Sequence, residues 1–162
     1  MSIAPNTLDL IGNTPMVRLE GPSAETGCTI LGKCEYANPG ASVKDRAALF
    51  IVEDAEARGV LKPGGTIVEG TAGNTGIGIA LVANAKGYRT IIVMPDSMSL
   101  ERKILIRAYG AELVLTPAAE GMKGSVAASE ELGKQIPGSV LVRQFDNPAG
   151  PKIHRETTAE EI

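Results

Sequence analysis

Residues 66–94 read TIVEGTAGNTGIGIALVANAKGYRTIIVM, and most of the evidence for the fold class lies in this segment. Two runs rich in β-branched residues, 66–69 and 89–94, predict strands. Between them, residues 77–86 are apolar on nearly every side, which is typical of a buried helix, and Gly87 can end it. A strand, a helix and a second strand joined by short connections predict two parallel strands in one sheet.

The same alternation continues on both sides of this segment. The other expected elements are strands at 29–35, 111–115 and 140–142 and helices at about 43–58, 100–109 and 121–135. The predicted fold class is therefore α/β, a three-layer open parallel sheet with flanking helices. Residues 1–28 carry little regular pattern, and residues 157–162 resemble the start of a helix, with a threonine as its cap and glutamate in the first turn.

A lysine lies at the start of the expected helix at 43–58, in the sequence NPGASVKDR at 38–46. Ser42 can cap this helix, and Asp45 completes an approximate capping box. Lys44 then occupies the first turn, where the helix dipole disfavours a cation by about 0.3–1 kcal/mol. One explanation is a nucleophilic lysine, which uses the neutral amine. The other is a solvated lysine whose charge is balanced by Asp45, and this segment alone leaves both open.

The loop TAGNTG at 71–76 is the second candidate for chemistry. Its threonine hydroxyls, the Asn74 amide and the N–H groups of the following helix could together bind an anion. A tight turn built from turn-prone residues is the alternative. Because the carboxyl ends of parallel strands lie at one edge of a sheet, we expect this loop, Lys44, residues 96–99 and Gln144 to line that edge.

The composition indicates an ordinary globular domain. The chain has 162 residues, of which 43% are hydrophobic and 22% charged, and its formal net charge is −3. Few aromatic residues and no basic stripe argue against a nucleic-acid-binding surface. We expect no membrane span and no signal peptide. The two cysteines are too few for a disulfide scaffold and fit a cytoplasmic compartment, with Cys34 buried.

Other kinds of site have weak support. The glycines from Gly73 onward follow the order GxxGxG, which differs from the GxGxxG of dinucleotide-binding loops. His154 is the sole histidine, and the spacing shows no Ser-His-Asp or Cys-His arrangement around it. No cluster of metal ligands is evident, so we expect no metal.

Several motifs together resemble the cysteine synthase family, the O-acetylserine sulfhydrylases. These are pyridoxal-phosphate enzymes of the tryptophan-synthase-β fold type. The motifs are IGNTP at 11–15, NPGASVKDR at 38–46, TAGNTG at 71–76, MPDSMSLER at 94–102, GMKG at 121–124, QFDNP at 144–148 and IHRET at 153–157. Their order and spacing cover essentially the whole chain.

The resemblance implies a role for individual residues. Lys44 matches the lysine that binds pyridoxal phosphate covalently, and Asn74 matches the residue that hydrogen-bonds the ring hydroxyl oxygen of the cofactor. The group that holds the carboxylate of the amino-acid substrate is matched by Thr71, Ala72, Asn74, Thr75 and Gln144. This sequence departs from the family at Ala72, where serine is common. The implied reaction makes L-cysteine from O-acetyl-L-serine and sulfide, with Lys44 removing the α-proton.

The resemblance also implies how the chain is organised. The family's fold has two α/β domains with the cofactor between them. Residues 38–148 would form the small domain, and residues 1–37 and 149–162 would belong to the large domain, the latter cut short. The remainder of the large C-terminal domain, with the loop that binds the cofactor phosphate, would be absent. We therefore expect an N-terminal portion that has little activity alone.

The resemblance suggests partners and alternatives as well. The expected partners are the small-molecule substrate, a second copy in a homodimer and the C-terminal peptide of serine acetyltransferase. Nucleic acids and membranes are not expected to bind. An enzyme similar to cystathionine β-synthase is the first alternative, and a non-catalytic fragment or binding module is the second.

Overall fold

The computed structural model describes residues 3–144, 147 and 149–162 and centres on a four-stranded parallel sheet. In spatial order the strands are β5 (Glu112–Thr116), β4 (Arg89–Pro95), β3 (Thr66–Gly70) and β6 (Val140–Leu141). Val68 of β3 is paired with Ile91 of β4 on one side and with Leu141 of β6 on the other. Each neighbouring pair is parallel, as successive strand–helix–strand units require.

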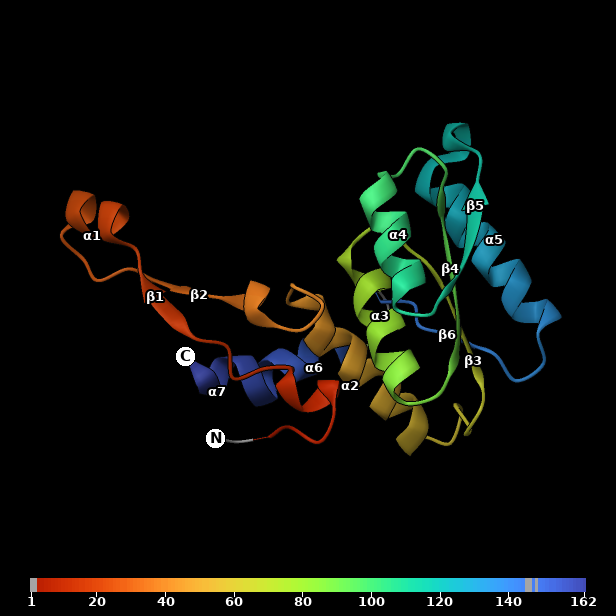
Figure 1. Cartoon of the computed structure of the whole chain (residues 1–162), viewed down its shortest axis with the longest axis horizontal. Coiled ribbons are helices and arrows are strands. Elements are labelled where there is room, and N and C mark those ends of the chain that lie inside the picture. The colour runs from red at the N-terminus through yellow and green to blue at the C-terminus, as the bar shows by residue number, and fades with distance from the viewer. Residues whose placement is uncertain (1–2, 145–146, 148) are drawn as a thin grey trace.

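Helices cover both faces of this sheet (Figure 1). One face is covered by α2 (Lys44–Ala57), α3 (Asn74–Ala85) and α4 (Leu100–Ala108), and the other by α5 (Gly121–Gln135). Each face has its own apolar cluster, one around Ile92 and Met94 and the other around Val68, Ile91 and Val93. The prediction of a three-layer α/β fold with a parallel sheet is confirmed.

The central elements are the most buried part of the fold. All residues of β3 are buried, and in β4 only Arg89 is exposed. A β-branched run suits this environment because a parallel strand in such a sheet packs against helices on both faces. Helix α3 is buried from Thr75 to Ala83, which explains why its sequence is apolar on nearly every side.

The N-terminal segment forms an arm outside the parallel sheet (Figure 1). Strands β1 (Met16–Arg18) and β2 (Leu31–Lys33) make a separate antiparallel pair, and α1 (Glu20–Thr26) connects them. The strand expected at 29–35 is therefore shorter than expected and belongs to a different sheet. Helix α1 was not expected because its sequence contains Gly and Pro, but a proline is tolerated in the first turn of a helix.

The remaining elements are short. Single 3₁₀ turns occur at η1 (Thr7–Leu10), η2 (Glu35–Ala37) and η3 (Ala118–Glu120). The C-terminal residues run without a break through α6 (Ala149–Ile153), the π-helical η4 (His154–Thr158) and α7 (Ala159–Glu161). Thr157 thus lies inside a helical segment, and its Oγ1 donates to the Ile153 carbonyl at 2.8 Å. The expectation that a threonine caps a new helix here was wrong, because the Thr157 hydroxyl bonds back to the preceding turn and the Thr158 side chain makes no cap hydrogen bond to α7.

Some expectations concern residues or divisions that the structure does not test. Of the motif at 144–148, Phe145, Asp146 and Pro148 lie outside the described residues, as do Met1 and Ser2. The division into a small domain at 38–148 and parts of a large domain stays a prediction. Among the described helices, none is both long and apolar enough to cross a membrane.

Candidate functional site

The strand order creates a crevice at the carboxyl ends of β3 and β6. From β3 the chain passes to β4 on one side, and after β5 it returns to β6 on the other side. The order reverses at β3, and open α/β sheets bind ligands at such a point. A pocket of about 840 Å³ lies there, lined by residues 69–75 on one side and by Leu141, Arg143 and Gln144 on the other.

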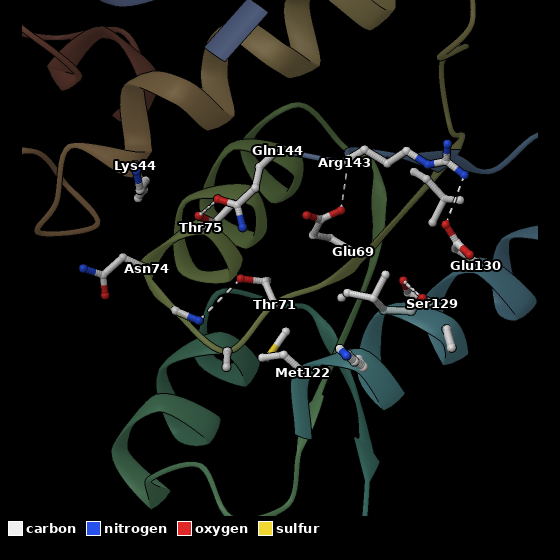
Figure 2. A pocket seen from close by; sticks show the side chains of 17 residues that line it. Lys44, Glu69, Thr71, Asn74, Thr75, Met122, Ser129, Glu130, Arg143 and Gln144 are labelled. Atoms are coloured by element: carbon white, nitrogen blue, oxygen red, sulfur yellow. Dashed lines mark hydrogen bonds and ion pairs between the residues drawn. The ribbon is translucent and has the colours of Figure 1, made fainter. Parts of the chain in front are cut away.

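Lys44 is the first residue of α2, and its side chain lines this pocket (Figure 2). The N-cap residue of α2 is Val43, so the prediction that Ser42 is the N-cap was wrong, although Ser42 Oγ accepts a hydrogen bond from the Lys44 N–H at 3.1 Å. Asp45 does not complete the expected capping box. Its Oδ2 instead accepts from the Gly40 N–H at 2.5 Å, and the side chain is fully buried. None of the ion pairs among the described residues includes Lys44, so the proposed balance of its charge by Asp45 is not formed.

A close approach of α2 and α3 brings Lys44 to the pocket. A Cβ on Gly78 would lie 2.9 Å from the Lys44 carbonyl oxygen and 3.2 Å from the Cβ of Ala48. Contacts under 3.0 Å to backbone atoms would force the helices apart. Glycine at position 78 therefore allows the start of α2 to lie against α3.

The loop at 71–76 contributes the start of α3. This helix begins at Asn74, three residues before the expected start, and Gly73 flanks it without a side-chain cap. The N–H groups of Asn74 and Thr75 lie in the first turn, where the helix itself supplies no acceptor. Thr71 is buried, and its Oγ1 accepts from the Gly73 N–H at 3.4 Å. Open N–H groups, hydroxyls and an amide thus come together at one wall of the pocket.

Thr75 and Gln144 meet across the pocket from different parts of the chain. Thr75 Oγ1 donates a hydrogen bond to Gln144 Oε1 (Figure 2). The Ala72 carbonyl accepts from Arg102 Nη1 at 2.7 Å, which links the loop to α4. Residues 96–99 directly follow β4 and so lie at the predicted edge of the sheet, but they are not among the residues that line the pocket. Ser99 instead caps α4, where its side chain accepts from the Arg102 N–H.

The pocket also contains residues that the sequence analysis did not single out. Met122 and Val126 of α5 form an apolar wall, and Lys123 of α5 adds a second lysine. Glu69 of β3 is buried and lines the floor, close to Arg143 (Figure 2). The signal for Glu69 was present, because a carboxylate inside an apolar β-branched run is costly unless it has partners.

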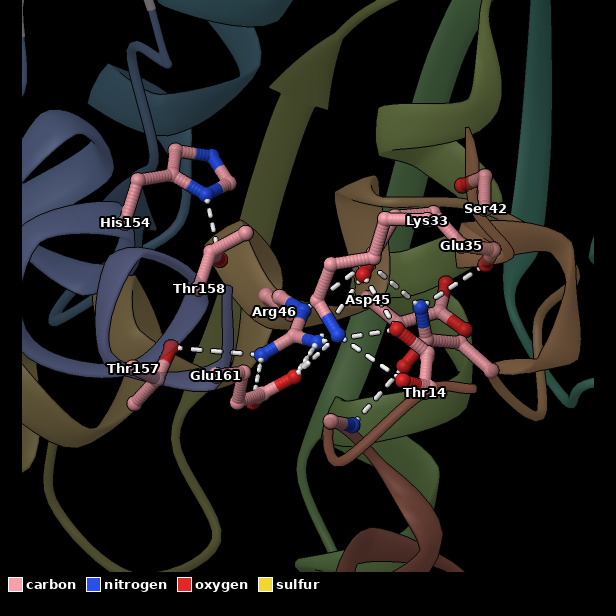
Figure 3. Close-up of polar contacts among 12 residues, drawn as sticks. Thr14, Lys33, Glu35, Ser42, Asp45, Arg46, His154, Thr157, Thr158 and Glu161 are labelled. Atoms are coloured by element: carbon pink, nitrogen blue, oxygen red, sulfur yellow. Dashed lines mark hydrogen bonds and ion pairs between the residues drawn. The ribbon is translucent and has the colours of Figure 1, made fainter. Parts of the chain in front are cut away.

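A second polar cluster surrounds Arg46 of α2 (Figure 3). The Arg46 side chain is 2% exposed and pairs with Glu35 (Nε–Oε2, 2.8 Å) and with Glu161 (Nη2–Oε2, 2.7 Å). Lys33 Nζ also lies 2.7 Å from Glu161 Oε2. Burial alone would raise the pKa of Glu35, but hydrogen bonds from Arg46, Thr14 and Asn38 outweigh it and lower the pKa to about 2. This cluster joins the N-terminal arm, α2 and α7.

His154 makes a local contact. Its Nδ1 lies 2.9 Å from Thr158 Oγ1, four residues further along the C-terminal helical segment. In the part of the chain that the structure describes, no three His, Cys, Asp or Glu side chains lie close enough together to hold a metal ion.

Comparison with known proteins points to a single family. Residues 7–162 match the family described as pyridoxal-phosphate dependent enzyme. The chain is 55% identical over 157 residues to a cysteine synthase of Flavobacterium sp., which covers 97% of this chain and 51% of that protein.

Two solved structures are similar in both sequence and fold. O-ureido-L-serine synthase superposes with a TM-score of 0.93 at 53% identity, covering 99% of this chain and 50% of the other. The O-acetylserine-dependent cystathionine β-synthase of Helicobacter pylori has a TM-score of 0.91 at 38% identity, covering 100% and 54%. The chain therefore spans about half the length of the relatives it matches. Since the family match extends over nearly all of these 162 residues, the chain belongs to the pyridoxal-phosphate-dependent enzymes.

Proposed function

We propose that this chain carries the lysine and the substrate-carboxylate site of an enzyme that makes L-cysteine from O-acetyl-L-serine and sulfide. The observation that carries the proposal is the convergence on one pocket of the Lys44 amine, the loop at 71–75 and Gln144. The donors present fit pyridoxal phosphate and an amino acid, because the Lys44 amine, which has no ion pair with any described residue, faces amide, hydroxyl and backbone N–H groups.

Lys44 has two tasks in this proposal. Its Nζ holds the cofactor covalently, and during the reaction it takes the proton from the α-carbon of the substrate. When bound, the cofactor supplies an electron sink for that carbon. Asn74 holds the ring oxygen of the cofactor through its amide. The packing of α2 against α3 at Gly78 keeps the lysine within reach of Asn74.

The substrate carboxylate is held at the start of α3. Thr71, Ala72, Asn74, Thr75 and Gln144 form this group. The first-turn N–H groups favour an anion, and the hydroxyls and amides add directed hydrogen bonds. Ala72 supplies only its backbone here, and a serine would add one hydroxyl. When the carboxylate is held, the α-hydrogen of the substrate points toward Lys44. This orientation accelerates the proton transfer.

Covalent trapping tests the assignment of Lys44. The 162-residue chain is incubated with pyridoxal phosphate, reduced with borohydride and mapped by mass spectrometry. We expect the label on Lys44 and its loss in Lys44→Ala. Lys123→Ala is the matched control, since Lys123 lines the same pocket, and it should keep the label. A label on Lys123 that persists in Lys44→Ala would contradict the proposal.

A chimera tests turnover, because the chain spans only half of its relatives. Residues 1–162 are followed by the second half of the Flavobacterium cysteine synthase, and the chimera is assayed with O-acetyl-L-serine and sulfide. We expect cysteine formation by the chimera, far slower formation by the 162-residue chain alone, and a loss of at least about 10³-fold in Lys44→Ala. Equal rates for the chimera and its Lys44→Ala variant would refute the catalytic role.

The same assay separates the alternatives. Cystathionine β-synthase activity would show as faster product formation with homocysteine than with sulfide. This alternative is supported by the similarity to the Helicobacter pylori enzyme. A non-catalytic binding module would bind amino acids without turnover in either form. The similarity to O-ureido-L-serine synthase makes O-ureido-L-serine a third product to measure, in an assay where hydroxyurea replaces sulfide as the nucleophile and acetate leaves.

The remaining proposals concern assembly. A homodimer is supported by apolar side chains exposed on the N-terminal arm, among them Val17 and Leu31 at 48% and 51%. A cytoplasmic location and binding of the serine acetyltransferase C-terminal peptide at the pocket mouth are proposed from the resemblance alone. Sedimentation of the chimera tests the dimer, and a titration with that peptide tests the contact.

A further inference from the structure

Glu69 is a carboxylate buried inside the sheet, in β3. Its residue is 5% exposed and follows Ile67 and Val68 in β3, and the ion pairs among the described residues do not include it. Burial raises the pKa of Glu69, and hydrogen bonds from the backbone N–H groups of Arg143 and Gln144 offset only part of that rise. Burial of a carboxylate costs free energy unless the carboxylate is hydrogen-bonded, so the groups that Glu69 contacts should give the reason for its position.

The reason lies where β6 leaves the sheet. The ladder between β3 and β6 has two pairs, Ile67 with Val140 and Val68 with Leu141. At Arg143 the backbone turns to a left-handed conformation with φ of 49°. This conformation costs a residue other than glycine about 1–2 kcal/mol. Glu69 Oε2 accepts from the Arg143 N–H at 3.0 Å, so a side chain takes the place of the next ladder bond.

The backbone held in this way carries Gln144. The Gln144 side chain reaches across the pocket and accepts from Thr75 Oγ1 at the start of α3. Figure 2 shows Glu69 to the right of this contact, with its carboxylate directed to the backbone of Arg143. The contacts thus form a continuous path from Glu69 through the turn at 143–144 to the carboxylate site.

We propose that Glu69 is a positioning residue, which fixes the turn at 143–144 so that Gln144 is presented to the carboxylate of the substrate. Glu69 itself touches neither cofactor nor substrate in this role. This inference rests on the proposed function only in assuming that Gln144 binds the substrate carboxylate. The hydrogen bonding of Glu69 to the turn does not depend on any activity.

Hydrogen exchange of backbone amides, measured on the 162-residue chain without cofactor, tests whether Glu69 fixes the turn at 143–144. In Glu69→Asp the shortened side chain withdraws its oxygen from the turn, so the Arg143 and Gln144 amides should exchange at least about tenfold faster. Glu69→Gln keeps an acceptor oxygen at the same reach and should restore protection. Unchanged exchange in Glu69→Asp, in a chain whose other strand amides stay protected, would overturn the proposal.

Kinetics of the chimera test whether this turn presents Gln144 to the substrate carboxylate. Loss of an aligned hydrogen bond to a carboxylate should raise KM for O-acetyl-L-serine about tenfold in Glu69→Asp and less than twofold in Glu69→Gln, with kcat changing less than KM. Gln144→Ala should raise KM similarly, and the double variant should add nothing further, because both changes remove one interaction. Additive effects, or a fall in kcat alone, would refute a role through Gln144.

Glu130 provides the matched control. It lines the same pocket and lies 3.2 Å from Arg143 Nη2, but it contacts the side chain rather than the backbone of the turn. Glu130→Gln should leave both amide exchange and KM unchanged. If Lys44 fails to label while the exchange result holds, the proposed function fails and the structural link through Glu69 survives.

Discussion

The parallel sheet and the cluster around Arg46 are buried to a similar degree but consist of opposite kinds of side chain. In β4, residues Ile91, Ile92, Val93 and Met94 are at most 3% exposed and belong to the two apolar clusters. Arg46 is 2% exposed and is surrounded by carboxylates. One region is held by the removal of apolar surface from water, and the other by directed, charged hydrogen bonds.

This difference separates the construction of the fold from the attachment of its outer segments. The sheet positions the pocket, whereas the Arg46 cluster ties α2 to α7 across a sequence separation of 115 residues, and Lys33 of the N-terminal arm pairs with the same Glu161. Apolar burial tolerates changes in pH, but a buried ion pair becomes a penalty once one partner is removed. The two regions should therefore respond differently to mutation and to pH.

The largest effect is expected when the charged cluster loses its cation. Arg46→Met keeps most of the side-chain volume but leaves Glu35 and Glu161 without their shared partner. We expect the free energy of unfolding at pH 7 to fall by about 3–5 kcal/mol, measured by urea denaturation. At pH 3 the penalty should shrink. The pKa of Glu35 is about 2 with Arg46 present, and without it the carboxyl is protonated at that pH.

Arg58→Met is the matched control for this prediction. Arg58 follows the C-terminal end of α2, and its Nε lies 2.8 Å from Asp54 in a pair that is largely exposed. Exposed pairs contribute about 0.3–0.5 kcal/mol, so this variant should be close to the parent chain at both pH values. If Arg46→Met lowers the free energy of unfolding no more than Arg58→Met does, the Arg46 cluster does not stabilise the attachment of the N-terminal arm and α7.

The sequence analysis predicted the sheet well and missed this cluster, for a physical reason. A parallel strand buried on both faces leaves a local signature, the uninterrupted β-branched run at 89–94. Arg46, Glu35 and Glu161 carry no such signature, because each alone is typical of a solvated surface. The carboxyl ends of parallel strands lie at one edge of a sheet, and this rule alone predicted that Lys44, the loop at 71–75 and Gln144 lie close together. The sequence marks Glu69 as unusual in its strand, but its partner could not be predicted, because the Arg143 N–H comes from a segment 74 residues away.

The second prediction concerns the loop before Lys44. Burial raises the pKa of Asp45 to about 6, offset in part by the Gly40 N–H and increased by the charge of Glu35. The folded chain then binds more protons than the unfolded chain between pH 4 and pH 6, so stability falls as pH rises through this window, by about 2 kcal/mol. Asp45→Asn keeps an acceptor for Gly40 and should remove that fall. Denaturation of both proteins at pH 4, 5 and 6 measures it, and parallel pH profiles would contradict the assignment.

The smallest effect is expected in the apolar sheet, when one buried methyl group is removed. Ile92 has no exposed surface, and Ile92→Val should lower the free energy of unfolding by about 0.5–1.5 kcal/mol, since a small cavity replaces the lost contacts. Ile104→Val on α4, where Ile104 is 56% exposed, should change stability by less than about 0.5 kcal/mol. The loss for Ile92→Val should be the same at pH 4 and pH 7, because no titrating group gains or loses a partner. A loss that varied with pH as that of Arg46→Met does would show that the sheet and the charged cluster unfold as one electrostatically coupled unit.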